Sequence, residues 1–316
     1  MSKSSTTAGI DASKPKLDIA IHGRPEHWQV ENSPAGWRQL LQILKEAGVS
    51  RVGIEATGGY ERGVVDALRN AGFTVLVLQP IQVKAYARLR LRRAKNDKID
   101  AVLIAACAAT LDPPKIAPDK RLAQLARLLT FVEQIDRDIV RLKTRLEHID
   151  DARLQRMVLS DIARLDLRRA AELGRIAKTL RMHEDLARRF ELVLSVPGIG
   201  ERTAITLIVR LPELGRVSRE EIAALAGLAP FDDDSGTRKG QRRTAGGRSQ
   251  VRRALYNAAL PACHRWNKAL IRLYASLMLK GKLHKVALVA CARKLLIYAN
   301  TVVQRGTPWV QKPEAT

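Results

Sequence analysis

The sequence predicts three parts: an α/β domain over residues 1–112, a long helical arm over 113–190 and a mainly α-helical C-terminal domain over 191–316. Three observations predict this division. Strand-like and helix-like apolar patterns alternate along the first part. One sustained helical stripe of apolar residues runs through the second part. Apolar helices separated by glycine-containing turns and a strongly basic stretch make up the third part.

The first part begins with three short strands, joined at first by a hairpin connection at Ser13–Lys16. These strands are predicted at Ala8–Ala12, Leu17–Ile21 and Trp28–Glu31. An amphipathic helix follows, opened by Pro34 and stopped by Gly48. Strands and helices then alternate through Val52–Ala56, Glu61–Asn70, Thr74–Leu78, Ile81–Arg93 and Asp97–Thr110. A meander of three strands followed by such alternation is the order of ribonuclease-H-like nuclease domains.

Four carboxylates lie at positions that suggest a functional site: Asp11, Glu55, Asp97 and Asp100. Asp11 and Glu55 each follow a short apolar run, and the other two lie three residues apart in a predicted helix. Residues at that spacing share one helix face. Two neighbouring carboxylates repel each other when both are ionised, unless a cation lies between them. Clustered carboxylates are the hard oxygen ligands that suit Mg²⁺ in phosphoryl transfer.

Each acid also has a purely structural interpretation. Asp11 can cap a turn, Asp97 can cap its helix, and Asp100 can pair with a surface lysine. Taken together they favour a metal site, because an acid at the end of each of two buried strands is costly unless it is paired or binds metal. Three other acids are expected to be solvated: Asp18, Asp66 and Glu61. Asp18 competes most closely for a role, because it also lies on a strand near Asp11.

The composition indicates a polyanionic partner. Lys and Arg number 55 and Asp and Glu 32, which gives a net charge of +23 and a pI near 10.5. Such charge suits double-stranded DNA, because released counterions supply much of the affinity. No unbroken apolar run reaches the roughly 18 residues of a membrane span, and the N-terminus lacks a secretory h-region. The three cysteines show neither disulfide nor zinc spacing. We expect a cytoplasmic, nucleoid-associated protein.

The arm carries apolar residues at steps of three and four from Leu122 to Ile149, and a second series from Leu159 to Leu186. This pattern predicts a coiled coil of two antiparallel helices, or helices that pair between protomers. Scaffolding or dimerisation is the expected role.

The C-terminal domain begins with Val196–Ala204, in which Gly198 and Gly200 suggest a helix-hairpin-helix turn that contacts a phosphate. A plain helix–helix turn explains the same residues. Downstream lies the most basic stretch, predicted to grip a nucleic-acid backbone. It contains Arg238, Lys239, Arg242, Arg243, Arg248, Arg252 and Arg253. Ser235 precedes it, and chemistry alone favours a turn residue there, since no histidine relay flanks it. Ser249, the competing serine, is predicted as a helix N-cap.

Three N-terminal motifs and the C-terminal block resemble those of the DEDD transposases, insertion-sequence recombinases with a RuvC-like N-terminal domain. The matching segments are Gly9–Lys14, Gly53–Tyr60, Lys95–Ala101, Pro197–Gly200, Gly227–Pro230, Ser235–Gly236, Gly246–Arg248 and Val251–Tyr256. The resemblance implies that Asp11, Glu55, Asp97 and Asp100 bind Mg²⁺ and that Ser235 attacks DNA to form a covalent phosphoserine. It also implies a homo-oligomer, an active site shared between protomers and a structured guide RNA. Thr244 and Ala245 differ from the Ile-Ser frequent in the family.

Two other functions remain open from the sequence. A metal-dependent nuclease of the Holliday-junction-resolvase kind would use activated water and form no covalent intermediate. An architectural DNA-binding protein would use the glycine turn and the basic stretch without any chemistry.

Overall fold

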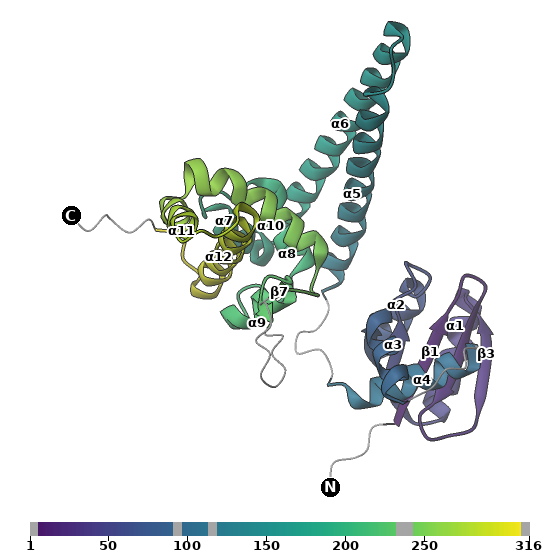
Figure 1. The fold of residues 1–316 in the computed structure, drawn as a ribbon. Helices are drawn as coiled ribbons and strands as arrows, with labels where there is room; N and C mark the ends of the chain where they lie inside the picture. The colour runs from purple at the N-terminus through teal and green to yellow at the C-terminus, as the bar shows by residue number, and fades with distance from the viewer. Residues whose placement is uncertain (1–5, 91–96, 113–118, 232–242, 311–316) are drawn as a thin grey trace. The chain divides into compact units, whose positions relative to one another are not determined.

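The computed structural model describes residues 6–90, 97–112, 119–231 and 243–310, apart from the side chains of Asp97, Lys98, Phe231 and Arg243. The chain divides into two compact units, Met1–Lys115 and Ile116–Thr316. We call them unit 1 and unit 2. Each has its own hydrophobic core, and Figure 1 shows the elements of both.

Unit 1 is built on a five-stranded sheet in the order β3-β2-β1-β4-β5. Its strands are β1 (Thr6–Ala12), β2 (Lys16–Ile21), β3 (His27–Glu31), β4 (Val49–Glu55) and β5 (Thr74–Leu78). The first three form an antiparallel meander, and β4 and β5 run parallel to β1. The predicted order of a strand meander followed by strand–helix alternation is therefore confirmed.

The connections also follow the sequence signals. The hairpin between β1 and β2 is closed by the Ser13 amide, which donates to the Lys16 carbonyl at 3.0 Å. The helices of this unit are α1 (Pro34–Glu46), α2 (Arg62–Asn70), α3 (Pro80–Leu89) and α4 (Asp97–Thr110). Ser33 caps α1 by accepting from the Gly36 amide, and Gly48 turns the chain at φ +67° after it. The helix predicted to reach Arg93 ends at Leu89, before residues that the structure does not describe.

The two faces of the sheet are covered by different helices. Alternate residues of a strand point to opposite faces. One face carries Ile10, Ile19 and Ile54, which share a buried cluster with Leu40 of α1 and Leu68 of α2. The other face carries Leu76 and Leu78 of β5, which pack with α3 and α4 through Val83, Leu103 and Ile104. The α4 face also holds Gly9, Asp11, Gly53 and Glu55, because each lies an odd number of residues from Ile10 or Ile54.

Unit 2 begins with two long helices, α5 (Lys120–Leu146) and α6 (Ala152–Arg181), which project as an arm in Figure 1. Asp119 caps α5 by accepting from the Arg121 amide at 2.8 Å. The outer part of the arm has a small core of Ile135, Ile139, Val158 and Ile162. Leu159, predicted to belong to the buried stripe, is instead half exposed, because Val158 takes the inward position on α6.

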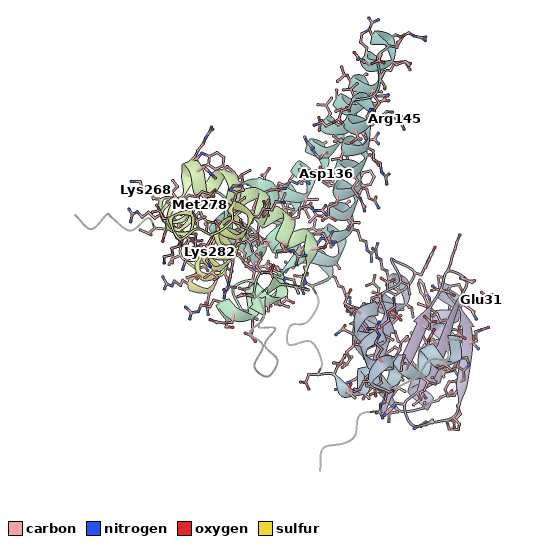
Figure 2. The ribbon with its side chains drawn as sticks, in the orientation of Figure 1. Glu31, Asp136, Arg145, Lys268, Met278 and Lys282 are labelled. Atoms are coloured by element: carbon pink, nitrogen blue, oxygen red, sulfur yellow. The ribbon has the colours of Figure 1, made fainter. Side chains whose placement is uncertain are left out.

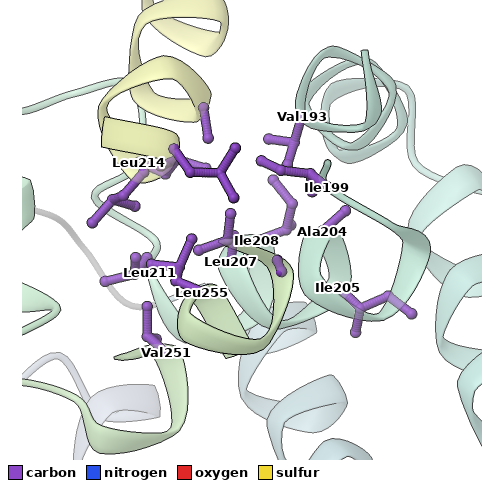
Figure 3. Packing of buried hydrophobic residues seen from close by; sticks show 14 of the residues in the cluster. Val193, Ile199, Ala204, Ile205, Leu207, Ile208, Leu211, Leu214, Val251 and Leu255 are labelled. Atoms are coloured by element: carbon purple, nitrogen blue, oxygen red, sulfur yellow. The ribbon is translucent and has the colours of Figure 1, made fainter. Parts of the chain in front are cut away.

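The remaining helices pack around one continuous core, part of which Figure 3 shows. They are α7 (Glu184–Leu194), α8 (Glu201–Arg210), α9 (Arg219–Leu225), α10 (Ser249–Pro261), the π-helical turn η1 (Ala262–Trp266), α11 (Lys268–Leu279) and α12 (His284–Arg305). A short antiparallel pair joins β6 (Pro230–Phe231) to β7 (Arg243–Thr244). Leu125 and Leu129 at the base of the arm belong to this same core. The predicted boundary near residue 190 therefore falls inside unit 2, and the three-part division stays a prediction.

By length and composition, α12 could cross a membrane, with a mean hydropathy of 1.6 over its most apolar window. Half of that window is buried inside unit 2, and Cys291 and Leu295 are completely inaccessible. We therefore assign α12 to the core of this unit. Burial raises the pKa of the Cys291 thiol to about 12, which suits a packing role.

Candidate active site and nucleic-acid interface

Helix α4 lies directly on the backbone of the two central parallel strands. A Cβ atom at Gly9 of β1 would overlap the Ala101 carbonyl oxygen and the Ala105 amide nitrogen. A Cβ at Gly53 of β4 would overlap the Ala108 side chain in the same way. Glycine within a strand often marks such a close backbone approach. These two glycines therefore fix where α4 crosses the sheet.

The same contacts position three of the predicted acids. Asp11 lies two residues beyond Gly9 and Glu55 two beyond Gly53, so both carboxylates belong to the face that α4 covers. Ile10 and Ile54 pair in register on parallel strands, which brings the two acids to neighbouring strand ends, about 4.8 Å apart at the backbone. Asp100 immediately precedes Ala101, the residue of α4 that contacts Gly9. Each of the three acids has interaction partners within the chain.

The fourth acid, Asp97, is the first residue of α4, but its side chain lies outside the described part of the protein. Among the described residues, no three His, Cys, Asp or Glu side chains gather closely enough to hold a metal ion. The metal site therefore stays a prediction. In its favour, all four predicted ligands are carboxylates, which suit Mg²⁺, and the strands that carry Asp11 and Glu55 meet α4 on one face of the sheet.

The sequence predicts a solvated Asp18, but the structure buries it. It pairs directly opposite Asp11 on β2 and is only 3% exposed. Its carboxylate accepts from Gln29 Nε2 at 2.8 Å and lies 3.3 Å from Lys16 Nζ and 3.5 Å from His27 Nε2. Two of these partners, Gln29 and His27, come from β3, which the sequence of β2 alone does not reveal. Asp18 is engaged by neighbours on its own sheet.

Glu61 was also expected to be solvated, and it is only 8% exposed. Its Oε2 accepts from the Gly59 amide at 2.8 Å, the Thr57 hydroxyl at 2.9 Å and the Thr57 amide at 3.2 Å. Burial alone would raise the pKa of Glu61, but these hydrogen bonds outweigh it and leave the pKa below its usual value. Glu61 thereby holds the loop that directly follows Glu55. In the sequence, the only hint of this role is that Glu61 lies two residues after the Gly58–Gly59 pair.

Ser235 and three of the predicted basic contacts, Arg238, Lys239 and Arg242, lie outside the described residues. The base of the segment that carries them is described, because β6 and β7 pair through Pro230 with Thr244 and Phe231 with Arg243. Arg243 belongs to this pair by its backbone.

Two glycines at the base of that segment touch each other. Gly227 and Gly247 both have positive φ, and a Cβ on Gly247 would overlap the backbone of Gly227. Only glycine combines that conformation with such an approach at low cost. The Arg248 amide also donates to the Leu225 carbonyl at 2.8 Å. The polypeptide on either side of Ser235 is thus tightly joined.

Two arginines predicted to contact nucleic acid have partners within unit 2. Arg248 makes a two-pronged ion pair with Glu213, and Arg252 donates to the carbonyls of Gly246 at 2.7 Å and Gly227 at 3.3 Å. Both therefore brace the base of the Ser235 segment, while Arg253 is exposed. Their contact with nucleic acid stays a prediction. Ser249 is the first residue of α10, whose N-cap is Arg248, so its prediction as N-cap is wrong by one position.

The Pro-Gly-Ile-Gly turn joins α7 to α8. Gly198 has φ +100°, and a Cβ there would overlap the side chain of Ala262, so this glycine is required for packing against the end of α10. Gly200 is the exposed N-cap of α8, and a Cβ there would meet open space. Of the two glycines, only Gly200 has its surroundings open to a phosphate.

Comparisons with known proteins agree with these motifs. Residues 8–150 match a family model described as a transposase, of the DEDD type, and residues 190–275 match the model of the transposase IS116/IS110/IS902 family. The chain is 27% identical to the pilin gene-inverting protein of Moraxella bovis, over 97% of this chain and 98% of that protein. It is 32% identical to a 43.6 kDa protein of insertion element IS110 from Streptomyces coelicolor, over 37% of this chain and 29% of that protein.

A solved structure is also similar over a smaller region. RuvC of T. thermophilus in complex with a Holliday junction substrate matches 33% of this chain and 91% of its own, at 19% identity and a TM-score of 0.28. The two transposase models together match most of the chain: the first covers the acid-bearing sheet and continues through α5, and the second covers much of the helical C-terminal region. The chain belongs to the IS110 family of insertion-sequence transposases, a family of DNA recombinases.

Proposed function

We propose that this protein cuts and rejoins DNA at specific sites by attack of the Ser235 hydroxyl on a phosphodiester, assisted by Mg²⁺. The single observation that carries the proposal is the placement of Asp11 and Glu55 at neighbouring ends of β1 and β4. Both lie on the face that α4 crosses, and α4 begins with the two remaining acids. This arrangement supports a single metal site formed by acids from three separate segments.

In this proposal Asp11, Glu55, Asp97 and Asp100 hold the metal. When bound, Mg²⁺ supplies Lewis-acid stabilisation of the scissile phosphate. Gly9 and Gly53 position α4, and Glu61 positions the loop after Glu55. Replacing Gly9 or Gly53 by a larger residue would displace the acids without removing them.

Ser235 forms a bond from its oxygen to phosphorus, and the bond from phosphorus to the leaving DNA oxygen breaks. The serine proton goes to solvent or to the leaving oxygen. Attack by a DNA hydroxyl then releases the serine and rejoins the strand. The glycine contact and the hydrogen bonds of Arg252 hold the two ends of the segment that carries this serine close together.

We further propose that the protein acts as a homo-oligomer in which acids and serine come from different protomers. The arm supports this proposal, because apolar side chains are exposed along what we take to be a coiled coil: Val140, Met157, Leu159 and Leu167. The α7–α8 turn would serve as the helix-hairpin-helix, with Gly200 towards phosphate. A structured guide RNA is compatible with the net charge of +23. The two Moraxella relatives, named for pilin gene inversion, make inversion of a DNA segment a second possible outcome of the same chemistry.

Covalent trapping tests the chemistry. End-labelled DNA carrying a cognate site is incubated with protein and Mg²⁺, and adducts are resolved on a denaturing gel. We expect an adduct with wild-type protein and with Ser249→Ala, and none with Ser235→Ala. An adduct that persists in Ser235→Ala contradicts the proposed nucleophile.

The alternatives give different results in the same assay. Metal-dependent cutting without any adduct would indicate a resolvase-like nuclease that uses water. Undiminished function of Asp11→Ala would indicate an architectural protein.

A further inference from the structure

Unit 2 exposes an aromatic and basic surface that the proposed chemistry does not use. Its centre is a hollow of about 380 Å³ lined by Leu260, Pro261, His264, Arg265 and Trp266. We call these five residues, together with Tyr274, the Trp266 surface. Trp266 is 59% exposed, although a tryptophan of a folded protein is normally well buried.

The local backbone explains why three consecutive side chains face solvent. Pro261 ends α10, and η1 follows as a π-helical turn in which the Asn267 amide donates to the Ala262 carbonyl at 2.9 Å. Asn267 is buried, and its Nδ2 donates to the Pro197 carbonyl at 3.0 Å. The widened turn is thus anchored from within, while His264, Arg265 and Trp266 are all exposed. π-helical turns of this kind occur frequently at functional sites.

Aromatic rings from three elements line up next to this turn. The His264 and Tyr274 rings lie 4.9 Å apart, and those of Tyr274 and His284 lie 5.8 Å apart. The Tyr274 hydroxyl is 2.6 Å from His284 Nδ1, which fixes the middle ring between α11 and α12. The planes of neighbouring rings are inclined by 51° and 84°, so this row is a rigid aromatic border beside Trp266 and not a single flat stacking face.

The segment of the chain that carries these rings contains basic residues and no acidic ones. From Ser235 to Pro313 the sequence contains no aspartate or glutamate. Lys268 and Lys282, labelled in Figure 2, are exposed in this part of unit 2, as is Arg265 beside Trp266. A surface that combines exposed rings with cations matches a polyanion that carries planar groups.

We propose that the Trp266 surface binds an unpaired DNA strand, with a base stacked on the Trp266 indole and the phosphates contacted by Arg265 and Lys268. An intact duplex cannot use the indole, because its base faces are already stacked on one another. A neutral peptide would leave the basic surroundings uncompensated. The inference extends the proposed recombinase function, from which it takes only DNA as the ligand, since cut and exchanged strands pass through unpaired states.

The test measures the binding of a fluorescent 20-residue oligo(dT) to full-length protein, beside a duplex and an oligo(U) of equal length. We expect Trp266→Ala to weaken oligo(dT) binding about tenfold, the typical effect of losing one stacking ring, and Trp266→Phe to keep most of it. Duplex binding should stay within about twofold, because the phosphate contacts remain. The matched control is Phe131→Ala on α5, which removes another exposed aromatic ring and should leave all three affinities unchanged.

Circular dichroism establishes that each variant is folded. Equal oligo(dT) affinity of Trp266→Ala and wild-type protein would overturn the proposal. So would an equal loss for duplex, a loss confined to oligo(U), or a change only in solution mass, which would indicate a protein partner. The readout is binding without cleavage, so loss of the Ser235 adduct and loss of stacking can be observed separately.

Discussion

Arg248 and Glu213 form a two-pronged ion pair in which Nη1–Oε2 and Nη2–Oε1 are both 2.7 Å. This planar geometry is the strongest form of a charge-assisted hydrogen bond between side chains. Burial alone would raise the pKa of Glu213, and the hydrogen bonds and charge of Arg248 outweigh it, leaving the pKa below its usual value. The pair ties the turn after α8 to the start of α10, next to the base of the Ser235 segment.

We predict that Arg248→Ala and Glu213→Gln reduce DNA cutting to the same extent, and that the double variant is no worse than either. Each substitution breaks the same Arg248–Glu213 ion pair, so the second substitution has nothing further to break. Each should also lower the free energy of unfolding by about 1 kcal/mol, a modest value because the arginine is partly exposed. Denaturant unfolding and a cleavage assay measure the two effects. Arg248→Lys should behave like Arg248→Ala, because a lysine cannot form the planar fork.

The opposite pattern would assign Arg248 to DNA contact. In that case Glu213→Gln would release the arginine and tighten DNA binding, while Arg248→Ala would weaken it. Additive losses in the double variant would likewise contradict a shared bracing role.

A second prediction concerns the crossing of α4 over β1. We expect Gly9→Ala to lower the free energy of unfolding by about 1–3 kcal/mol, because the added methyl group overlaps backbone atoms of Ala101 and Ala105 that cannot rotate away. DNA cutting should fall as well, since Asp100 moves with the helix. The control is Gly174→Ala in α6, where the methyl group meets open space and should stabilise by about 0.5–1 kcal/mol. Equal stability of Gly9→Ala and wild type would show that α4 can shift freely.

Much of unit 1 could be predicted from the sequence, because its signals are local. Strand alternation and the Pro34 and Gly48 signals gave the element order, and α4 has the predicted bounds. Burial of Asp18 could not be predicted, because its partners Gln29 and His27 come from another strand. The Arg248–Glu213 pair spans 35 residues and joins a turn to a helix start, and no short-range pattern marks it.

The third prediction separates Asp11 from its cross-strand neighbour Asp18. Asp11→Asn should reduce DNA cutting by more than about a hundredfold, because it removes a carboxylate that we propose as a metal ligand. Asp18→Asn should retain most activity but lose about 1–3 kcal/mol of stability, since the hydrogen bond from Gln29 would be disturbed at a buried position.

Added Mg²⁺ provides an independent measurement for this pair. A ligand that binds only the folded state raises its melting temperature. We expect Mg²⁺ to raise the melting temperature of wild-type protein and Asp18→Asn, but not of Asp11→Asn. An equal increase in the melting temperature of Asp11→Asn would show that Asp11 is not a metal ligand.

The last prediction is a pH dependence that arises from Glu61. Its pKa in the folded protein lies below the ordinary value of 4.5, so the unfolded chain takes up the proton first as pH falls. The stabilisation is therefore fully present above pH 4.5 and is lost as pH falls through the lower, folded-state pKa. Glu61→Gln removes this dependence, because an amide does not titrate in this range.

Unfolding free energies measured from pH 7 to pH 3 test the effect of Glu61. At pH 7 we expect Glu61→Gln to be less stable than wild type by about 1–3 kcal/mol, because a charged acceptor of three hydrogen bonds is replaced by a neutral one. The difference should narrow below pH 4.5. A difference that stays constant over the whole range would mean that the carboxylate charge does not hold the loop after Glu55. The loop geometry would then arise from the turn at Gly58 and Gly59, both of which have positive φ.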